Sequence, residues 1–345
     1  MTENNIKLRI NRSNNKTFKA CLIIFSGSAA LLLLMLISIT QGAAGIPLST
    51  VIEAFTNMDV NNPRHLLAVD MRLPRVIAAA LVGSALAVSG SLMQGMTRNP
   101  LADSGLMGLS SGSGLALAIC FAFLTGISYT QIVLMSFMGA GLGAVSVYTI
   151  SNLVPGGNNP MKLILSGAAV STLLSALSQG IAISAKASQN LAFWTLGSVS
   201  GTSWNQIKIV APVILASLAA SIALSRSISV LNMGEEVAGG LGLRIKHVKF
   251  IGTLLVVLLA GTSVALAGII AFVGMLVPHL ARFAVGPDYR LIIPASAVLG
   301  AILLVAADIV AKTLHPPVEI PIGAIISLLG VPVFLYFAKK QKRGM

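Results

Sequence analysis

Long apolar stretches without charged residues, separated by short polar connections, are the main pattern of this chain. Residues 104–161, for example, contain no Asp, Glu, Lys or Arg. A helix that crosses a bilayer needs about 20 mostly apolar residues, so this stretch is too long for one such helix and long enough for two. Gly126–Thr130 is the predicted break between them. The whole pattern predicts ten spanning helices, at residues 20–40, 73–97, 105–125, 130–153, 161–184, 206–226, 249–271, 273–287, 291–311 and 320–338.

The predicted fold is therefore all-α, a polytopic membrane protein with about ten transmembrane helices. A short segment, residues 1–19, precedes the transmembrane domain at 20–338, and residues 339–345 form a tail. The apolar run at 20–40 has about 20 residues, whereas the apolar core of a signal peptide has about 7–15, which favours an uncleaved anchor. A signal peptide is the competing interpretation, because Gly42-Ala43-Ala44 resembles a cleavage site.

Composition agrees with this class of protein. The chain has 345 residues, of which 55% are hydrophobic and only 10% charged, whereas soluble domains are about 25% charged. The formal net charge is +13, but the basic residues lie in short connections and form no contiguous patch of the kind that binds nucleic acid. We therefore expect no nucleic-acid partner and explain the basic residues by membrane topology.

The basic residues also predict the orientation, because cytoplasmic loops carry an excess of Lys and Arg. Ten spans place both termini on one side, and 17 of the 23 Lys and Arg residues lie on that side. We therefore predict that the chain lies in the cytoplasmic membrane with both termini in the cytoplasm. The remaining six lie on the opposite side: Arg64, Arg72, Arg75, Lys186, Lys208 and Lys312.

Two glycine patterns concern helix packing. Gly83–Gly90 in the second span resembles Gly261–Gly268 in the seventh. Five spans separate them, so a duplication of that unit would be inverted, a recurrent design of transporters. The alternative is that Gly- and Ala-rich helices look alike by composition. In the third and fourth spans, glycines four residues apart predict close helix contact: Gly108 and Gly112, and Gly139 and Gly143.

Catalytic and metal-binding patterns are missing from the sequence. There is no Gly-Lys-Ser/Thr of a nucleotide-binding loop and no His-Glu-x-x-His, and the four histidines lie far apart. We expect no catalytic residue, no metal ligand and no cofactor. Asp308 is the best candidate for an acid within the membrane, but it lies four residues before Lys312, which predicts an ion pair on one helix face. A role in proton coupling is the alternative. Without a convincing acid at mid-membrane, a separate ATPase is the expected energy source.

The connection at residues 227–248 predicts a contact surface for such a partner. Gly234 or Asn232 can start a short helix, whose positive N-terminal end suits the carboxylates of Glu235 and Glu236. Apolar side chains follow at Val237, Ala238 and Leu241, and glycines at 239, 240 and 242 can end the helix. A solvated loop on the membrane surface is the alternative interpretation.

Five blocks of sequence resemble the FecCD-type permeases of ABC importers for iron siderophores, heme and cobalamin. They occur in the family's order: Arg72–Arg75, Asn99–Ala102 with Gly105–Gly108, Glu235–Gly242, Val277–Arg282, and Ala307–Val310 with Glu319–Gly323. Three features depart from the family pattern: Ser104 replaces its usual proline, Lys312 replaces the arginine of some members, and Pro316-Pro317 stiffens the connection before Glu319.

The resemblance implies a permease without catalysis of its own and with three kinds of partner. These are cytoplasmic ATPase subunits, an external substrate-binding protein and a second permease subunit, identical or homologous. The expected cargo is a ferric siderophore; heme or cobalamin are alternatives, and an ion-coupled secondary transporter is the rival from another class.

The resemblance also assigns roles to residues. It matches the family's docking cations with Arg72, Arg75 and Lys312, and its inner gate with Asn158 and Asn159. The residues expected to couple to the ATPase are Glu235, Glu236, Ala238, Leu241, Gly242 and Arg244.

Overall fold

In the computed structural model the described residues are 3–42, 44–124, 126–153 and 160–342. They form helices and connecting loops, and no β-strand occurs among them. The all-α prediction is confirmed.

Ten of the described helices correspond in order to the ten predicted spans. Seven are long and apolar enough to cross a membrane, and three are shorter apolar helices. The predicted break near residue 126 is confirmed, because one helix ends at Phe123 and the next begins at Tyr129. The ten are α1 (Glu3–Thr40), α4 (Leu73–Thr97), α5 (Leu109–Phe123), α6 (Tyr129–Leu153), α7 (Pro160–Ser184), α9 (Trp204–Asn232), α11 (Ile245–Ala267), α12 (Val273–Val285), α13 (Tyr289–Thr313) and α14 (Ile322–Lys342).

Six short elements connect these helices, and only the one after α9 was predicted. Five others escape a search for long apolar runs because each has nine residues or fewer. The six are α2 (Leu48–Thr56), α3 (Pro63–Leu66), the π-helix η1 (Leu67–Arg72), the 3₁₀-helix η2 (Ser104–Met107), α8 (Ser188–Leu196) and α10 (Glu235–Gly240).

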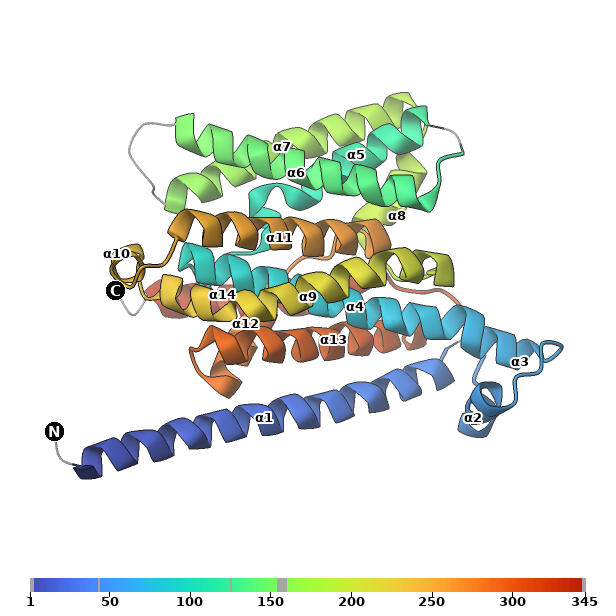
Figure 1. Cartoon of the computed structure of the whole chain (residues 1–345). Helices are drawn as coiled ribbons and strands as arrows, with labels where there is room; N and C mark the ends of the chain where they lie inside the picture. Colours follow the sequence, from blue (N-terminus) through green and yellow to red (C-terminus); the bar gives the residue numbers. More distant parts are fainter. Residues whose placement is uncertain (1–2, 43, 125, 154–159, 343–345) are drawn as a thin grey trace.

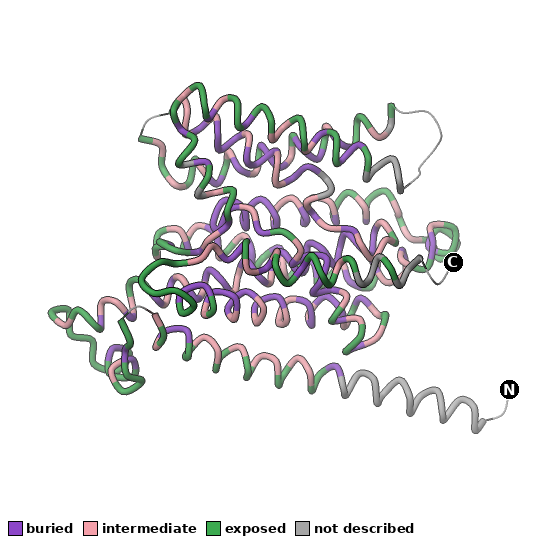
Figure 2. The backbone as a smooth tube through the Cα atoms, turned by 180° about the vertical axis from the view of Figure 1, so that it is seen from behind, coloured by how far each residue is buried: buried purple, intermediate pink, exposed green. Residues whose placement is uncertain are grey.

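The long helices lie roughly side by side, with α4 at the centre of the bundle (Figure 1). Helix α4 contacts α9, α11, α12 and α13, while α5, α6 and α7 form a group on one flank and α1 lies on the other. Burial follows this arrangement, since buried backbone is concentrated in the middle of the bundle (Figure 2). Exposed large apolar side chains occur on α1, α6, α7 and α14, as expected for helices that face lipid or another subunit.

The two ends of the bundle carry different elements. Helix α10 lies at the same end of the bundle as the start of α1 and the end of α14, and we call this end the α10 end (Figure 1). Helices α2, α3 and α8 lie at the opposite end, which we call the α2 end.

Glycine pairs bring the helices of the α5–α6 crossing into backbone contact. A Cβ atom added to Gly112 would overlap the carbonyl oxygen of Gly139, and one added to Gly143 would overlap that of Gly108. The predicted role of these glycines in close helix approach is confirmed. In the proposed repeat, Gly83 meets Gly300 of α13 and Gly261 meets Phe137 of α6. Helix α13 is the ninth span and α6 the fourth, and a five-span duplication would relate these two spans to each other, as it would relate the second to the seventh. The repeat itself stays a prediction.

Helix α12 is short because the chain before it is not helical. Its 13 residues measure about 20 Å at 1.5 Å per residue, less than the roughly 30 Å of a bilayer core. The preceding residues 268–272 are non-helical. In this segment the amide of Ile269 donates to the carbonyl of Trp194, near the end of α8, at 3.0 Å. Just before the segment, the carbonyl of Ala267 at the end of α11 accepts from the amide of Ser198, in the loop after α8, at 2.8 Å. Such backbone inside a membrane protein is stable where protein covers it.

Candidate functional sites at the two ends of the bundle

A buried cluster of charged side chains lies at the α2 end. Arg75, in the first turn of α4, donates from Nε to Asp308 Oδ1 of α13 at 2.8 Å. Its Nη1 donates to Glu319 Oε1, in the loop before α14, at 2.6 Å. Asp308 Oδ2 lies 3.5 Å from Lys312 Nζ, one turn along α13. The predicted Asp308–Lys312 ion pair is confirmed, and it belongs to a larger network that also holds Arg75 and Glu319.

Two cations of this region bind the end of α1. Arg72 donates from Nη1 to the carbonyl of Ile39 at 2.7 Å and from Nη2 to the carbonyl of Ala44. Lys312 donates from Nζ to the hydroxyl of Ser38 at 2.7 Å and also to the backbone carbonyl of that residue. The charges therefore hold together α1, α4 and α13 at this end.

This geometry bears on the predicted docking residues. Arg72 is 8% exposed and Lys312 5% exposed, while the side chain of Arg75 is 12% exposed. All three are directed to partners within the chain and do not stand out as a ring of surface cations. Their docking role stays a prediction.

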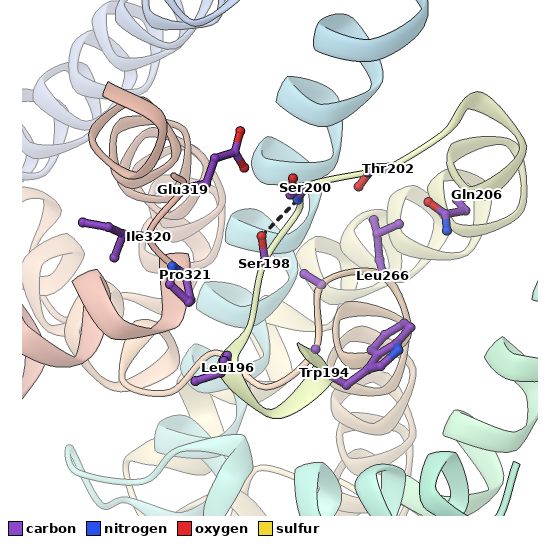
Figure 3. Close-up of a pocket in the computed structure, with 13 residues that line it drawn as sticks. Trp194, Leu196, Ser198, Ser200, Thr202, Gln206, Leu266, Glu319, Ile320 and Pro321 are labelled. Atoms are coloured by element: carbon purple, nitrogen blue, oxygen red, sulfur yellow. Dashed lines mark hydrogen bonds between the residues drawn. The ribbon is translucent and has the colours of Figure 1, made fainter. Parts of the chain in front are cut away.

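Glu319 connects the charge cluster to a cavity. Burial alone would raise the pKa of this carboxyl group, but the hydrogen bond and positive charge of Arg75 bring the pKa below its usual range. Its side chain keeps 38% exposure and lies at the wall of a cavity of about 470 Å³ (Figure 3). The other walls are formed by the end of α8, the loop that leads into α9, the end of α11 and residues 320–321.

The residues predicted to couple to an ATPase lie together at the α10 end. Helix α10 begins at Glu235 after Gly234 and has both glutamates in its first turn, as predicted. Glu235 pairs with Lys249 Nζ of α11 at 2.7 Å. Gly242 has a φ of +78°, a conformation that glycine adopts without strain, and Arg244 directly precedes α11.

The apolar residues of α10, and Leu241 directly after it, differ in exposure. Ala238 is fully buried, while Val237 is 46% exposed and Leu241 is 68% exposed. Ala238 thus anchors the short helix on the bundle, and the two larger side chains are left uncovered. An uncovered apolar surface on a projecting helix is typical of a protein contact site.

A second polar network, which the sequence did not indicate, runs inward from this end. Ser229, near the end of α9, donates to Asp288 at 2.8 Å and accepts from the amide of Tyr289 at 2.9 Å. Arg282 of α12 donates to the hydroxyl of Tyr289 at 2.9 Å and approaches Gln94 Oε1 at 3.5 Å. Arg282 is thus bound within the protein.

The predicted gate residues Asn158 and Asn159 lie outside the described residues. Among the residues that the structure describes, no group of three or more His, Cys, Asp or Glu side chains could hold a metal ion.

Comparison with known proteins gives one consistent family. Residues 30–340 match the model of the FecCD transport family. The iron(3+)-hydroxamate import system permease protein FhuB of Bacillus subtilis is 46% identical over 331 residues, which cover 96% of this chain and 86% of that protein. The hemin transport system permease protein HmuU of Yersinia pestis is 35% identical, over 91% of this chain and 95% of that one.

A solved structure supports the same fold. An inward-facing conformation of an ABC transporter of the proposed metal-chelate type matches with a TM-score of 0.80 and 26% identity. The match covers 92% of this chain and 99% of that chain. The ten-helix bundle is thus the architecture of a membrane-embedded permease.

Proposed function

Because this chain belongs to the FecCD transport family, we propose that it is the permease subunit of an ATP-driven importer that carries a ferric siderophore across the cytoplasmic membrane. The observation that carries this proposal is the match over residues 30–340, which includes both the spanning helices and α10. The chain forms the membrane pathway and hydrolyses no ATP itself; separate cytoplasmic subunits supply that energy.

The choice of cargo rests on the relatives. FhuB, named for iron(3+)-hydroxamate import, shares 46% of its aligned residues with this chain, whereas HmuU, named for hemin transport, shares 35%. We therefore favour a ferric siderophore over heme. An ion-coupled mechanism has less support, because Asp308 is held by Arg75 and Lys312.

The test of this proposal is uptake by a reconstituted importer. Proteoliposomes with this permease, its ATPase and its binding protein are expected to take up a ferric siderophore only when ATP is present on the ATPase side. Hemin offered at the same concentration is the competing cargo. Uptake driven by a proton or sodium gradient without ATP would contradict the proposal.

The orientation follows from the charge asymmetry along the chain. We propose that the α10 end faces the cytoplasm, because the sequence predicts 17 of the 23 basic residues on the side that carries both termini. A cysteine placed at Gln341 should then resist membrane-impermeant reagents in intact cells. Labelling of that cysteine from outside would contradict this orientation.

At the α2 end we propose that the binding protein docks over the buried cations. Arg72, Arg75 and Lys312 outnumber the carboxylates of Asp308 and Glu319 by one charge, so their field favours an acidic partner. To pair directly with Arg75, a carboxylate of the binding protein would have to displace Glu319 from it.

Asn158 and Asn159, before α7, remain the proposed inner gate.

Helix α10 is the proposed contact for the ATPase, and Leu241 provides a test. Replacing Leu241 with Asp is expected to lower ATP-driven uptake by about tenfold or more, since an unpaired charge buried in the contact costs more than the free energy that a tenfold change represents. Uptake and ATP hydrolysis in proteoliposomes give the measurement. Leu241→Met is the matched control, because it keeps an apolar side chain of similar size and should transport normally. Normal uptake by the Asp variant would show that α10 is not the contact.

A further inference from the structure

Helix α2 carries an apolar stripe that the described part of the chain leaves uncovered. Leu48, Ile52 and Phe55 are 52%, 55% and 51% exposed. They stand four and three residues apart, the spacing that places side chains on one face of a helix. Met58 and Val60, in the loop that follows, are exposed as well. So many large apolar side chains on one short surface segment indicate a contact with an apolar partner.

A neighbouring edge of the same helix holds α2 on the bundle. Val51 and Ala54 are buried in a cluster with apolar residues of α1, η1 and α4. At 3.6 residues per turn, these two side chains lie beside the stripe and not opposite it. The stripe thus continues the protein-facing edge of α2 sideways, onto the surface next to the bundle.

The cluster fixes α2 at the depth where α1 leaves the membrane. Ile39, in the last turn of α1, belongs to the cluster, and Met35, one turn earlier, packs against it. Arg72 ties the same region together, because it donates to the carbonyls of Ile39 and Ala44. Residues 20–40 are long and apolar enough to span a membrane, so their end marks the boundary between hydrocarbon and headgroups. Helix α2 lies at that boundary.

The surface next to α2 has the character of a lipid-facing surface. Helix α1 is the most apolar and the least buried of the seven long helices. Toward its end it exposes Leu33, Leu36 and Ile37, whereas contacts between helices in membranes are rich in small residues. Helix α2 lies on the flank of α1, away from α5, α6 and α7 (Figure 1). Its stripe also offers no charge with which an acidic binding protein could pair.

We propose that α2 is an interfacial helix whose Leu48, Ile52 and Phe55 insert into the lipid bilayer at the α2 end. Helices of this kind bury their apolar face about 5–10 Å into the boundary between headgroups and acyl chains. Through the shared cluster, lipid contact at α2 holds the ends of α1 and α4 at a constant depth. The inference goes beyond the proposed function, because it concerns the lipid contact of the chain and not its cargo.

Nitroxide spin labels on α2 measure this contact directly. One label is attached at Ile52→Cys or Phe55→Cys, after Cys21→Ala and Cys120→Ala have removed the two native cysteines. The full-length permease is placed in phosphatidylcholine nanodiscs. We expect oxygen, which dissolves in hydrocarbon, to relax both labels several times more strongly than a water-soluble nickel chelate does, at a depth of about 5–10 Å.

Glu53→Cys is the matched control. Glu53 is an exposed residue of α2 and lies two residues from Phe55, on the opposite side of the helix. Its label should show the reverse preference, with stronger relaxation by the nickel chelate than by oxygen.

Each competing occupant of the stripe gives a different result. Relaxation of the labels at 52 and 55 by the nickel chelate as strong as that of the control label would overturn the inference and place the stripe in water. Protection from the chelate that appears only after the binding protein is added would assign the stripe to that protein. Dipolar coupling between two labels, with poor access for both oxygen and the chelate, would assign it to a second copy of the chain.

Discussion

Replacing Asp308 with Asn is expected to destabilise the folded permease by about 3–5 kcal/mol, the range seen when one member of a buried ion pair is removed. Asp308 is fully buried and accepts from Arg75 at 2.8 Å, with Lys312 at 3.5 Å. Asparagine keeps the shape of the side chain and loses the charge. Arg75 then retains only Glu319, and Lys312 retains only neutral oxygens of Ser38.

Equilibrium unfolding in mixed detergent micelles measures this effect. The matched control is Asp70→Asn, the same substitution at an exposed position of the same end, where surface changes are usually within about 0.5 kcal/mol. The double variant Asp308→Asn with Lys312→Met should recover part of the loss, because it removes the cation that Asp308→Asn leaves unpaired. Stability equal to that of the control would mean that this cluster does not hold the helices together.

A methyl group at Gly90 is expected to have the second large effect. A Cβ atom at this position of α4 would overlap the carbonyl oxygen, the carbonyl carbon and the Cα atom of Gly274 in the first turn of α12. Backbone atoms cannot rotate away as a flexible side chain can, so the two helices must separate. Overpacking of this kind costs about 1–3 kcal/mol and occasionally more, and we expect Gly90→Ala to reach the upper part of that range.

The comparison that isolates this contact is Gly141→Ala in α6, where nothing lies within 4 Å of an added Cβ atom. Since alanine is the better helix former by about 1 kcal/mol, Gly141→Ala should be neutral or stabilising in the same unfolding experiment. We also expect Gly90→Ala to impair uptake in the fraction that folds, because the start of α12 is displaced. Equal stability of the two variants would contradict the close α4–α12 contact.

The sequence was sufficient for the features that depend on local length and composition. The number and order of the ten helices follow from the thickness of the bilayer, which sets how long an apolar run must be. The start of α10 at Glu235 and its end at Gly240 follow from glycines and first-turn carboxylates, which act within a few residues. Close contact at Gly112 and Gly139 follows from glycine spacing, because only glycine allows backbones to approach this closely.

The candidate sites were predicted only in part. The sequence found the Asp308–Lys312 pair, since both residues lie on one helix turn. It did not find the partners of Arg75, which are 233 and 244 residues away, or the burial of Arg72 and Lys312 against the end of α1. No spacing rule links residues so far apart in the chain.

Only the tertiary structure brings the loop before α9, the end of α11 and Glu319 together around one cavity. The apolar pattern decides which segments become spanning helices, because each segment must by itself be long and apolar enough to cross the bilayer. It does not decide which helix ends meet, because that depends on how all the helices pack. The position of Glu319 in the wall of that cavity depends on how these helix ends meet, so only the folded chain shows it.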